Sequence, residues 1–387
     1  MGRFAPPRGQ RGLTLIELMV SITIGLVVVG AVTYAYVGSK GVYRGNESVA
    51  RIQEAGRFAL DSIARDIRRA GALGCGSTTS ISPGQPVAIF VASPVALPVG
   101  PANSIQGFAP TAYNPLPLPT AQQPAGWTAP TGYPYWGGDV LQLQIASGVP
   151  ARVTTTPDTT AGTITIADNT TPGGAANFKQ NDYALLANCS AATVLQITGN
   201  GTATPATAPA ALGFAGSGGV VPAITASTAG AGVFSPITYP TLQHFDQVTY
   251  YVGKVPNSTS TQLPNGLSAL YRYSASNGGA PEELVENIED MDVVYGVDNS
   301  GTSTPSTAAA GTFVHAGGVA DWTKVVSVRI SVVAVGDQLG AAPSGQVLLF
   351  RGTDPNPTPA ASPAASDTRL RQVFVASAAL RDRFQLP

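Results

Sequence analysis

The chain begins with an apolar stretch, residues 13–37, that contains one charged residue, Glu17. At 1.5 Å per residue, a helix of about 20 apolar residues crosses the hydrocarbon core of a bilayer. The stretch therefore predicts a membrane-spanning helix. Arg3, Arg8 and Arg11 precede it without any acidic residue, and this excess of positive charge places the N-terminus in the cytoplasm.

The helical pattern continues beyond the apolar stretch to about Ala72, since no proline occurs between Pro7 and Pro83. Over residues 38–72, apolar positions recur near a period of 3.6 and charged residues occupy the opposite face. The apolar positions are Val49, Ile52, Ala59, Ile63 and Ile67. This second half is expected to be amphipathic and to pack on a sheet.

From Pro83 onward, apolar and polar positions alternate with a period of two, which predicts strands. The predicted strands are 87–91, 139–145, 183–187, 193–198, 245–252, 267–273, 291–297, 325–335, 346–351 and 370–377. Two Gly/Pro-rich insertions, 94–134 and 199–240, interrupt them and are expected to be long loops. The expected fold class is α+β, with the long N-terminal helix packed on an antiparallel β-domain over residues 73–387.

Composition narrows the possible functions. The 387 residues have a formal net charge of −1, which leaves no basic surplus to neutralise phosphates, so nucleic acid is not expected as a primary ligand. No Walker loop, H-E-x-x-H, G-x-S-x-G or C-x-x-C motif occurs, and His244 and His315 are isolated in the sequence. We therefore expect no catalytic residue, no cofactor and no metal site.

Two acidic segments have simple structural interpretations. Pro281 is followed by six acidic residues within 282–292, and a proline with glutamates in the first turn favours a helix start. Residues 298–301 (Asp-Asn-Ser-Gly) offer oxygen ligands that suit Ca²⁺, but the ligand set is incomplete and a turn is the expected structure.

The N-terminal residues resemble a known signal. Residues 11–18 (RGLTLIEL) are similar to the class III signal of type IV pilins and of type II secretion pseudopilins. The resemblance implies that a prepilin peptidase cleaves after Gly12, so that residues 1–12 form the leader peptide. It also implies that Leu13 becomes the N-methylated first residue, and that Glu17 sets the register during assembly.

A basic and then apolar N-terminus also occurs in secretory signal peptides and in ordinary membrane anchors. A secretory signal peptide has a shorter apolar region that ends in a small-residue cleavage site, which this stretch lacks. An ordinary membrane anchor does not account for Glu17, because a carboxylate within the hydrocarbon core costs about 3 kcal/mol on insertion scales. Both classes are therefore less consistent with residues 1–37 than a pilin-like signal.

Later segments, in shared order, resemble the PilW-type minor pilins: residues 71–75, 138–141, 188–195, 283–296 and 379–383. This resemblance implies a low-abundance subunit that helps to initiate a type IV pilus near its tip, with motility, adhesion and DNA uptake downstream. The implied partners are prepilin peptidase, the major pilin, other minor pilins, the assembly platform of the inner membrane and, as a further candidate, a tip adhesin. The implied location is the bacterial inner membrane, as a single-pass protein, and then the pilus at the cell surface.

Two further functions stay open. A minor pseudopilin of the type II secretion system shares this N-terminus, although pseudopilin globular parts are usually smaller. A membrane-anchored adhesin would use the aromatic residues of segment 94–136 to bind a glycan or a surface.

Cys75 and Cys189 are the only cysteines in the chain. Both follow the membrane span, on the oxidising side, so one disulfide between them is expected. Two buried thiols are the alternative.

Overall fold

The structure is a computed structural model of the chain. It describes residues 14–73, 76–77, 88–91, 101–110, 124–155, 163–167, 177–188, 191–199, 210–214, 240–258, 266–274, 280–298, 312–339, 342, 346, 348–349, 359–360 and 368–380. Gly12, Leu13, Cys75 and Cys189 lie outside the described residues. Contacts divide the chain into two compact units, Met1–Arg51 and Ile52–Pro387, which are described separately below.

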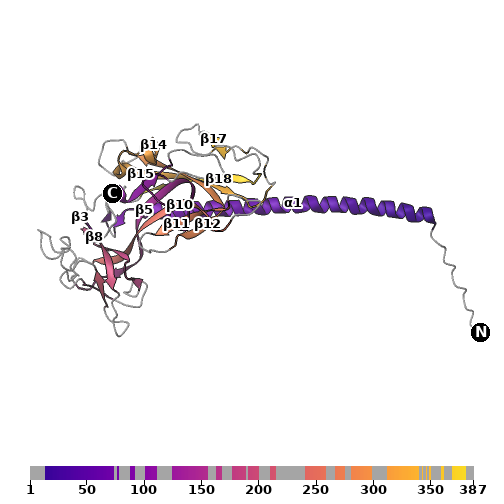
Figure 1. Ribbon diagram of the computed structural model, residues 1–387. Helices are drawn as coiled ribbons and strands as arrows, with labels where there is room; N and C mark the ends of the chain where they lie inside the picture. Colours follow the sequence, from indigo (N-terminus) through magenta and orange to yellow (C-terminus); the bar gives the residue numbers. More distant parts are fainter. Residues whose placement is uncertain are drawn as a thin grey trace, which may run out of the picture. The chain divides into compact units, whose positions relative to one another are not determined.

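A long helix, α1, runs from Leu15 to Ile67 (Figure 1). Thr14 caps its start, because the hydroxyl oxygen of Thr14 accepts a hydrogen bond of 3.3 Å from the N–H of Glu17. The helix ends before the expected Ala72. Its last residues tighten into a turn in which the N–H of Ala70 donates to the carbonyl of Ile67, and Gly71 then adopts a positive φ of 79°.

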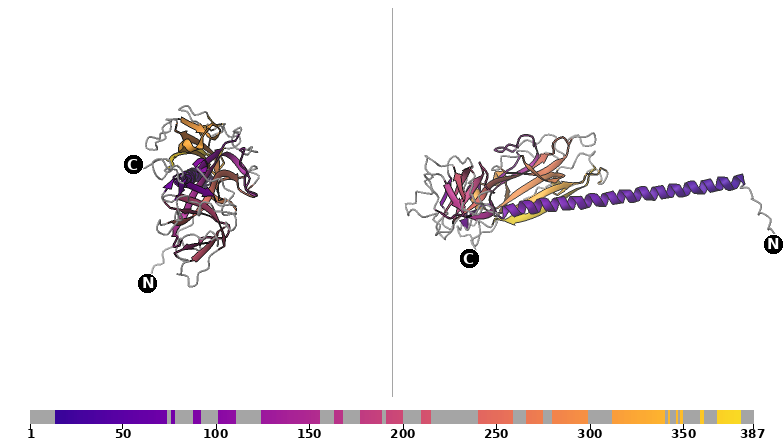
Figure 2. Two further views of the ribbon diagram at one scale, coloured as in Figure 1. Left: turned by 90° about the vertical axis from the view of Figure 1, so that its left-hand side faces the viewer. Right: turned by 90° about the horizontal axis from the view of Figure 1, so that it is seen from below.

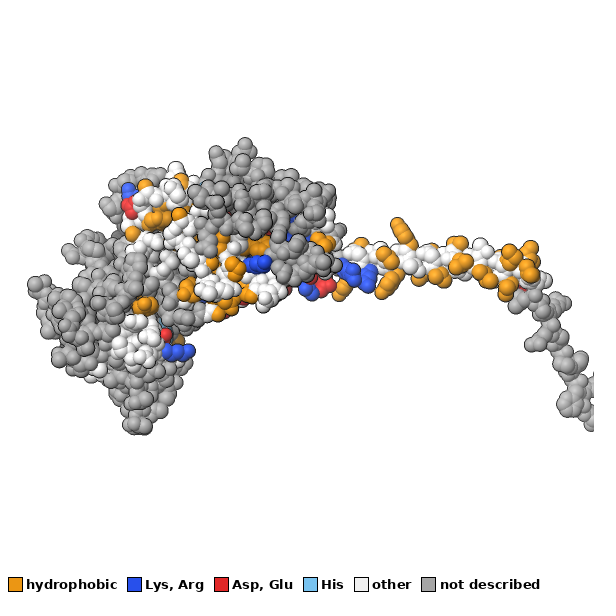
Figure 3. Space-filling model, viewed as in Figure 1, with side chains coloured by type: hydrophobic (Ala, Val, Ile, Leu, Met, Phe, Trp, Pro, Cys, Tyr) orange, Lys and Arg blue, Asp and Glu red, His pale blue; other side chains and the backbone are white. Residues whose placement is uncertain are grey.

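In the first unit, the apolar half of α1 exposes its side chains (Figure 3). An 18-residue window of the helix has a mean hydropathy of 2.4, and none of that window is buried. By length and composition, α1 is therefore able to cross a membrane.

In the second unit, the C-terminal part of α1 packs among the strands (Figure 2). Ile52, Ala59, Ile63 and Ile67 are all buried, so the predicted apolar face is confirmed for these positions. Gly56 lies directly under the ring of Phe374, where a side chain would collide with the ring.

The larger sheet contains ten strands among the described residues. They are β3 (Ala88–Val91), β4 (Ile105–Phe108), β5 (Tyr135–Arg152), β6 (Thr163–Ile166), β7 (Tyr183–Ala187), β8 (Ala191–Gly199), β9 (Ala210–Phe214), β10 (Thr241–Lys254), β11 (Ser268–Ser274) and β12 (Glu282–Glu286). The long strand β10 pairs antiparallel with β5, β7 and β11. The pairing of β3 with β8 is parallel, which departs from the expected antiparallel arrangement.

The smaller sheet has the order β14-β13-β15-β18, and all its pairings are antiparallel. Its strands are β13 (Ile288–Val297), β14 (Thr312–His315), β15 (Val325–Val335) and β18 (Arg371–Ala379). Two further short pairs are β1 (Ala72–Leu73) with β2 (Gly76–Ser77), and β16 (Leu348–Leu349) with β17 (Pro359–Ala360).

One hydrophobic core joins these elements. Ile63 and Ile67 of α1, Leu143 of β5, Val293 of β13 and Ile330 of β15 belong to the same buried cluster. The long helix packed on largely antiparallel sheets confirms the predicted α+β fold.

The predicted helix start after Pro281 is wrong, because Glu282–Glu286 form strand β12. Residue Val285 pairs with Leu270 of β11 and packs against the core, so tertiary pairing outweighs the preference of glutamates for a helix N-terminus. Asn287, with a positive φ of 62°, then separates β12 from β13.

The two insertions expected to be loops each contain a strand. Ile105–Phe108 form β4 within the first insertion, and Ala210–Phe214 form β9 within the second. Both strands are short, and each pairs with a neighbour in the larger sheet.

Candidate functional site

Glu17, the residue predicted to set the assembly register, lies in the first turn of α1, and it is exposed. Its backbone carbonyl accepts a hydrogen bond of 2.7 Å from the Ser21 hydroxyl. The surrounding apolar side chains are also exposed, including Leu15 at 78% and Ile16 at 72%. A carboxylate in such a surface needs a cationic partner once the surface is covered, because an unpaired charge in an apolar environment is costly.

The exposed apolar side chains continue along α1. As far as Tyr43 they are Leu15, Ile16, Leu18, Met19, Val20, Ile22, Ile24, Leu26, Val27, Val28, Val29, Val32, Tyr34, Tyr36, Val37, Val42 and Tyr43. A set this large is far beyond the scattered apolar residues of a normal soluble surface. It therefore marks a surface made for lipid or for other apolar helices.

The C-terminal part of α1 is anchored to the larger sheet by a buried polar contact. The hydroxyl of Tyr250 donates to Oδ2 of Asp66 at 2.7 Å, and Nε of Arg272 donates to the same oxygen at 3.3 Å. Burial raises the pKa of the Tyr250 hydroxyl well above its usual range, and the nearby Asp66 charge raises it further. Tyr250 therefore stays protonated and serves as a donor.

A second buried ion-paired group joins Glu289 of β13 to Arg369 and Arg371 at the start of β18. The carboxylate of Glu289 accepts from Nε of Arg371 and from Nη2 of Arg369, both at 2.7 Å. All three side chains are at most 5% exposed. This arrangement fixes the start of β18 against β13.

The aromatic residues considered for surface binding are largely packed against one another. The ring centroid of Trp127 lies 5.0 Å from that of Tyr251, and the centroid of Tyr133 lies 5.5 Å from that of Tyr271. Tyr135 is buried in the same cluster. These rings therefore contribute to a core more than to an open platform for a glycan.

His244 and His315, which are isolated in the sequence, both have acidic neighbours in the fold. Nδ1 of His244 lies 3.7 Å from Oδ2 of Asp182, and its ring stacks on Phe178. This histidine lines a polar cavity of about 230 Å³, and Lys179 lines the same cavity.

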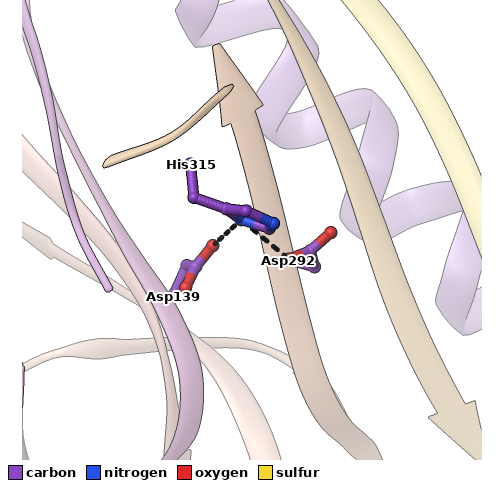
Figure 4. A group of neighbouring side chains, drawn as sticks. All are labelled: Asp139, Asp292 and His315. Atoms are coloured by element: carbon purple, nitrogen blue, oxygen red, sulfur yellow. Dashed lines mark ion pairs between the residues drawn. The ribbon is translucent and has the colours of Figure 1, made fainter. Parts of the chain in front are cut away.

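His315 meets two buried aspartates where the two sheets pack together (Figure 4). Its Nδ1 lies 3.4 Å from Oδ1 of Asp292 on β13 and 4.0 Å from Oδ2 of Asp139 on β5. One ligand atom from each of the three residues lies within 4.8 Å of the other two. No motif in the sequence indicates this cluster, because its members come from three distant segments.

Comparisons with known proteins find matches at both ends of the described fold. Residues 249–382 match the family of type IV pilus-assembly protein W (PilW), and residues 7–33 match the prokaryotic N-terminal methylation motif. A type IV-like pilin from Thermus thermophilus is similar at 14% identity, with a TM-score of 0.19, over 36% of this chain and 67% of that one. No curated protein sequence matches the chain.

The methylation motif covers Gly12, Leu13 and Glu17, and the PilW match extends from β10 to β18. The two matches thus fall on the apolar start of α1 and on the strands that hold its C-terminal part. Together with the long helix packed on antiparallel strands, the two matches support a type IV pilin-like protein with a class III prepilin signal.

Proposed function

We propose that this protein is a minor pilin that takes part in initiating or assembling a type IV pilus, in a complex near the pilus tip. The main support is the exposed apolar half of α1, which includes Glu17, on the same chain as a PilW-type β-domain. Its role is structural, and no reaction is proposed for it.

The apolar half of α1 serves two environments in this proposal. Before assembly it spans the inner membrane, with the N-terminus in the cytoplasm, as its length and the preceding arginines favour. After assembly it packs against the apolar helices of the major pilin and of other minor pilins, so that the same side chains remain away from water.

In this proposal, Glu17 determines the axial position at which the subunit docks on its neighbours in the pilus. Cleavage after Gly12 by prepilin peptidase would leave a positively charged amine on Leu13, and that amine would be methylated. In the dry core of a fibre, a carboxylate without a partner costs several kcal/mol, whereas one that faces the amine of a neighbouring subunit is compensated. A subunit would then dock stably only at the axial position that brings Glu17 to a neighbouring amine.

The two alternatives receive less support. A type II secretion pseudopilin shares the N-terminal motif, but the β-domain here matches the PilW family over residues 249–382. A surface-binding adhesin would need exposed aromatic rings in segment 94–136, where Tyr135 and Trp136 are buried and Trp127 and Tyr133 are half-buried.

Incorporation into pili tests the proposal. Deletion of this chain should reduce surface pili and leave type II secretion unchanged, whereas loss of secretion with normal piliation would favour the pseudopilin. In cells complemented with Glu17→Val, we expect normal membrane insertion but less of the protein in sheared pili, relative to the membrane fraction. Equal incorporation of the wild type and Glu17→Val would contradict the register role.

Glu47→Gln is the matched control, because Glu47 lies on the same helix but forms an exposed pair with Arg51. This variant should enter pili like the wild type. Gly12→Val tests processing separately. The intact mass of this variant should still include residues 1–12. In the wild type, a mature N-terminus other than Leu13 would contradict the predicted cleavage site.

A further inference from the structure

The cluster of Asp139, Asp292 and His315 lies apart from the surfaces used by the proposed pilin role. Its two carboxylates are almost fully buried, with side-chain exposures of 1% for Asp139 and 3% for Asp292. Two carboxylates this close in a buried site repel each other, and a cation between them offsets that repulsion.

The donor set indicates which cation fits. Two carboxylate oxygens and one imidazole nitrogen suit Zn²⁺, which binds both donor types, whereas Ca²⁺ and Mg²⁺ prefer oxygen ligands alone. Ligands 2.0–2.1 Å from a tetrahedral zinc ion are about 3.3 Å apart. The His315–Asp292 separation of 3.4 Å already meets this value, and the His315–Asp139 separation of 4.0 Å requires a shift of less than an ångström.

The backbone holds Asp139 in position for this role. Gly138 has a positive φ of 81°, and an added Cβ would lie 2.6 Å from the carbonyl oxygen of Met291, so β5 approaches β13 closely there. Oδ2 of Asp139 accepts a hydrogen bond of 2.8 Å from the N–H of Val293. Such outer hydrogen bonds commonly orient the carboxylates that bind metals.

A buried hydroxyl near the cluster is a second observation that points to a ligand. The Tyr295 hydroxyl is fully buried and has no hydrogen-bond partner among the described residues. Tyr295 lies on β13, the strand that also carries Asp292. A water bound to an ion at the cluster would offer this hydroxyl a hydrogen-bond partner.

We propose that Asp139, Asp292 and His315 bind one structural Zn²⁺ ion, with water as the fourth ligand, and that this ion joins β5 of the larger sheet to β13 and β14 of the smaller one. The His315 side chain is 33% exposed, so an ion would enter the cluster from the side on which His315 lies. The site is independent of the pilin role, since it uses none of the residues of the apolar half of α1.

Metal content of the full-length protein, purified in detergent, tests this proposal. The protein is stripped with a chelator, loaded with zinc chloride, freed of excess metal and analysed by mass spectrometry for metals. We expect about one zinc ion per chain in the wild type. We also expect a cobalt-substituted form with the visible absorption of a tetrahedral site. His315→Gln and Asp292→Asn should each retain less than a tenth of the zinc.

His244→Gln is the matched control, because His244 is the other histidine and also lies beside an aspartate. It should bind zinc like the wild type, and added zinc should raise the unfolding temperature of both but not that of His315→Gln. The proposal is overturned if the wild type binds no zinc, if binding survives in His315→Gln, or if calcium binds in place of zinc. If the variants do not fold, the zinc content and cobalt spectrum of the wild type decide.

Discussion

The hydroxyl of Tyr250 and the carboxylate of Asp66 are 2.7 Å apart, and this hydrogen bond joins the last turn of α1 to the long strand β10. The two residues are distant in the sequence, and both are buried. The bond therefore fixes the end of the helix to a defined position on the larger sheet.

Tyr250→Phe should lower the free energy of unfolding by about 1.5–3 kcal/mol, because a buried carboxylate loses a hydrogen-bond donor. Chemical denaturation of the purified protein measures this loss. Tyr273→Phe is the control, since Tyr273 is half-buried on β11 and its hydroxyl forms no hydrogen bond in the described part of the chain. Equal losses in the two variants would contradict a specific role for the Asp66 contact.

Glu289→Gln should be more damaging, with a loss of about 3–5 kcal/mol, because it leaves Arg369 and Arg371 buried without their shared carboxylate. Asp61→Asn removes an ion pair that is 67% exposed on both sides and should cost at most about 1 kcal/mol. Denaturant unfolding curves of the two variants measure the loss of free energy of unfolding for the buried and for the exposed ion pair. A loss in Glu289→Gln no larger than that in Asp61→Asn would refute the ranking.

Gly138→Ala should destabilise the protein through two effects, a strained positive φ and a collision with the backbone of β13. Gly132→Ala carries only the first effect, because Gly132 has a φ of 86° and open space where the Cβ would be. We expect a loss of about 1–2 kcal/mol for Gly132→Ala. The collision should add about 1–3 kcal/mol for Gly138→Ala. Indistinguishable unfolding temperatures would show that β5 and β13 separate at little cost.

Stability should fall at alkaline pH. Burial raises the pKa values of Tyr250, Tyr251, Tyr271 and Tyr295 above 10, their usual value. Between pH 10 and these higher values, the unfolded chain loses protons that the folded chain retains, so each tyrosine removes at most about 1.4 kcal/mol of stability per pH unit. Their contribution is complete below pH 10 and decreases above it.

Denaturant unfolding at pH 9, 10 and 11 measures this dependence. Tyr251→Phe should give a shallower decline than the wild type above pH 10, since it removes one of the titrating groups. A wild-type protein equally stable at pH 9 and pH 11 would contradict the prediction.

A disulfide between Cys75 and Cys189 remains a prediction from the sequence. It would close a loop of about 115 residues, for which the chain-entropy model gives at most about 4–5 kcal/mol. Peptide mapping without reduction should recover a linked pair that contains both cysteines. Two thiols that react with an alkylating agent in the native protein would argue against the bond.

Strands formed by one continuous apolar segment could be predicted from the sequence. Tyr183–Ala187 and Val325–Val335 have the expected bounds, the first as a short apolar run and the second as a stretch rich in valine. The buried face of α1 could be predicted equally well, because Ile63 and Ile67 repeat with the helical period. In each case the signal lies within one continuous segment.

Elements that depend on a partner strand could not be predicted. Ile105–Phe108 is a strand of four residues whose register is set by pairing with Val140–Leu143 of β5. The Asp139, Asp292 and His315 cluster is harder still to foresee, since its three members meet only when the two sheets pack. A lone histidine in a sequence does not show which acids will surround it.

The anchoring of α1 also has a mechanical consequence. Besides the contact of Asp66 with Tyr250, the N–H of Gly71 donates to the carbonyl of Gln144, and Nη2 of Arg69 donates to the carbonyl of Ala146. Asp66, Arg69 and Gly71 lie within six residues of one another, so this short stretch joins the end of the helix to both β5 and β10. A pull on the helix therefore reaches the larger sheet through two neighbouring strands and not through one.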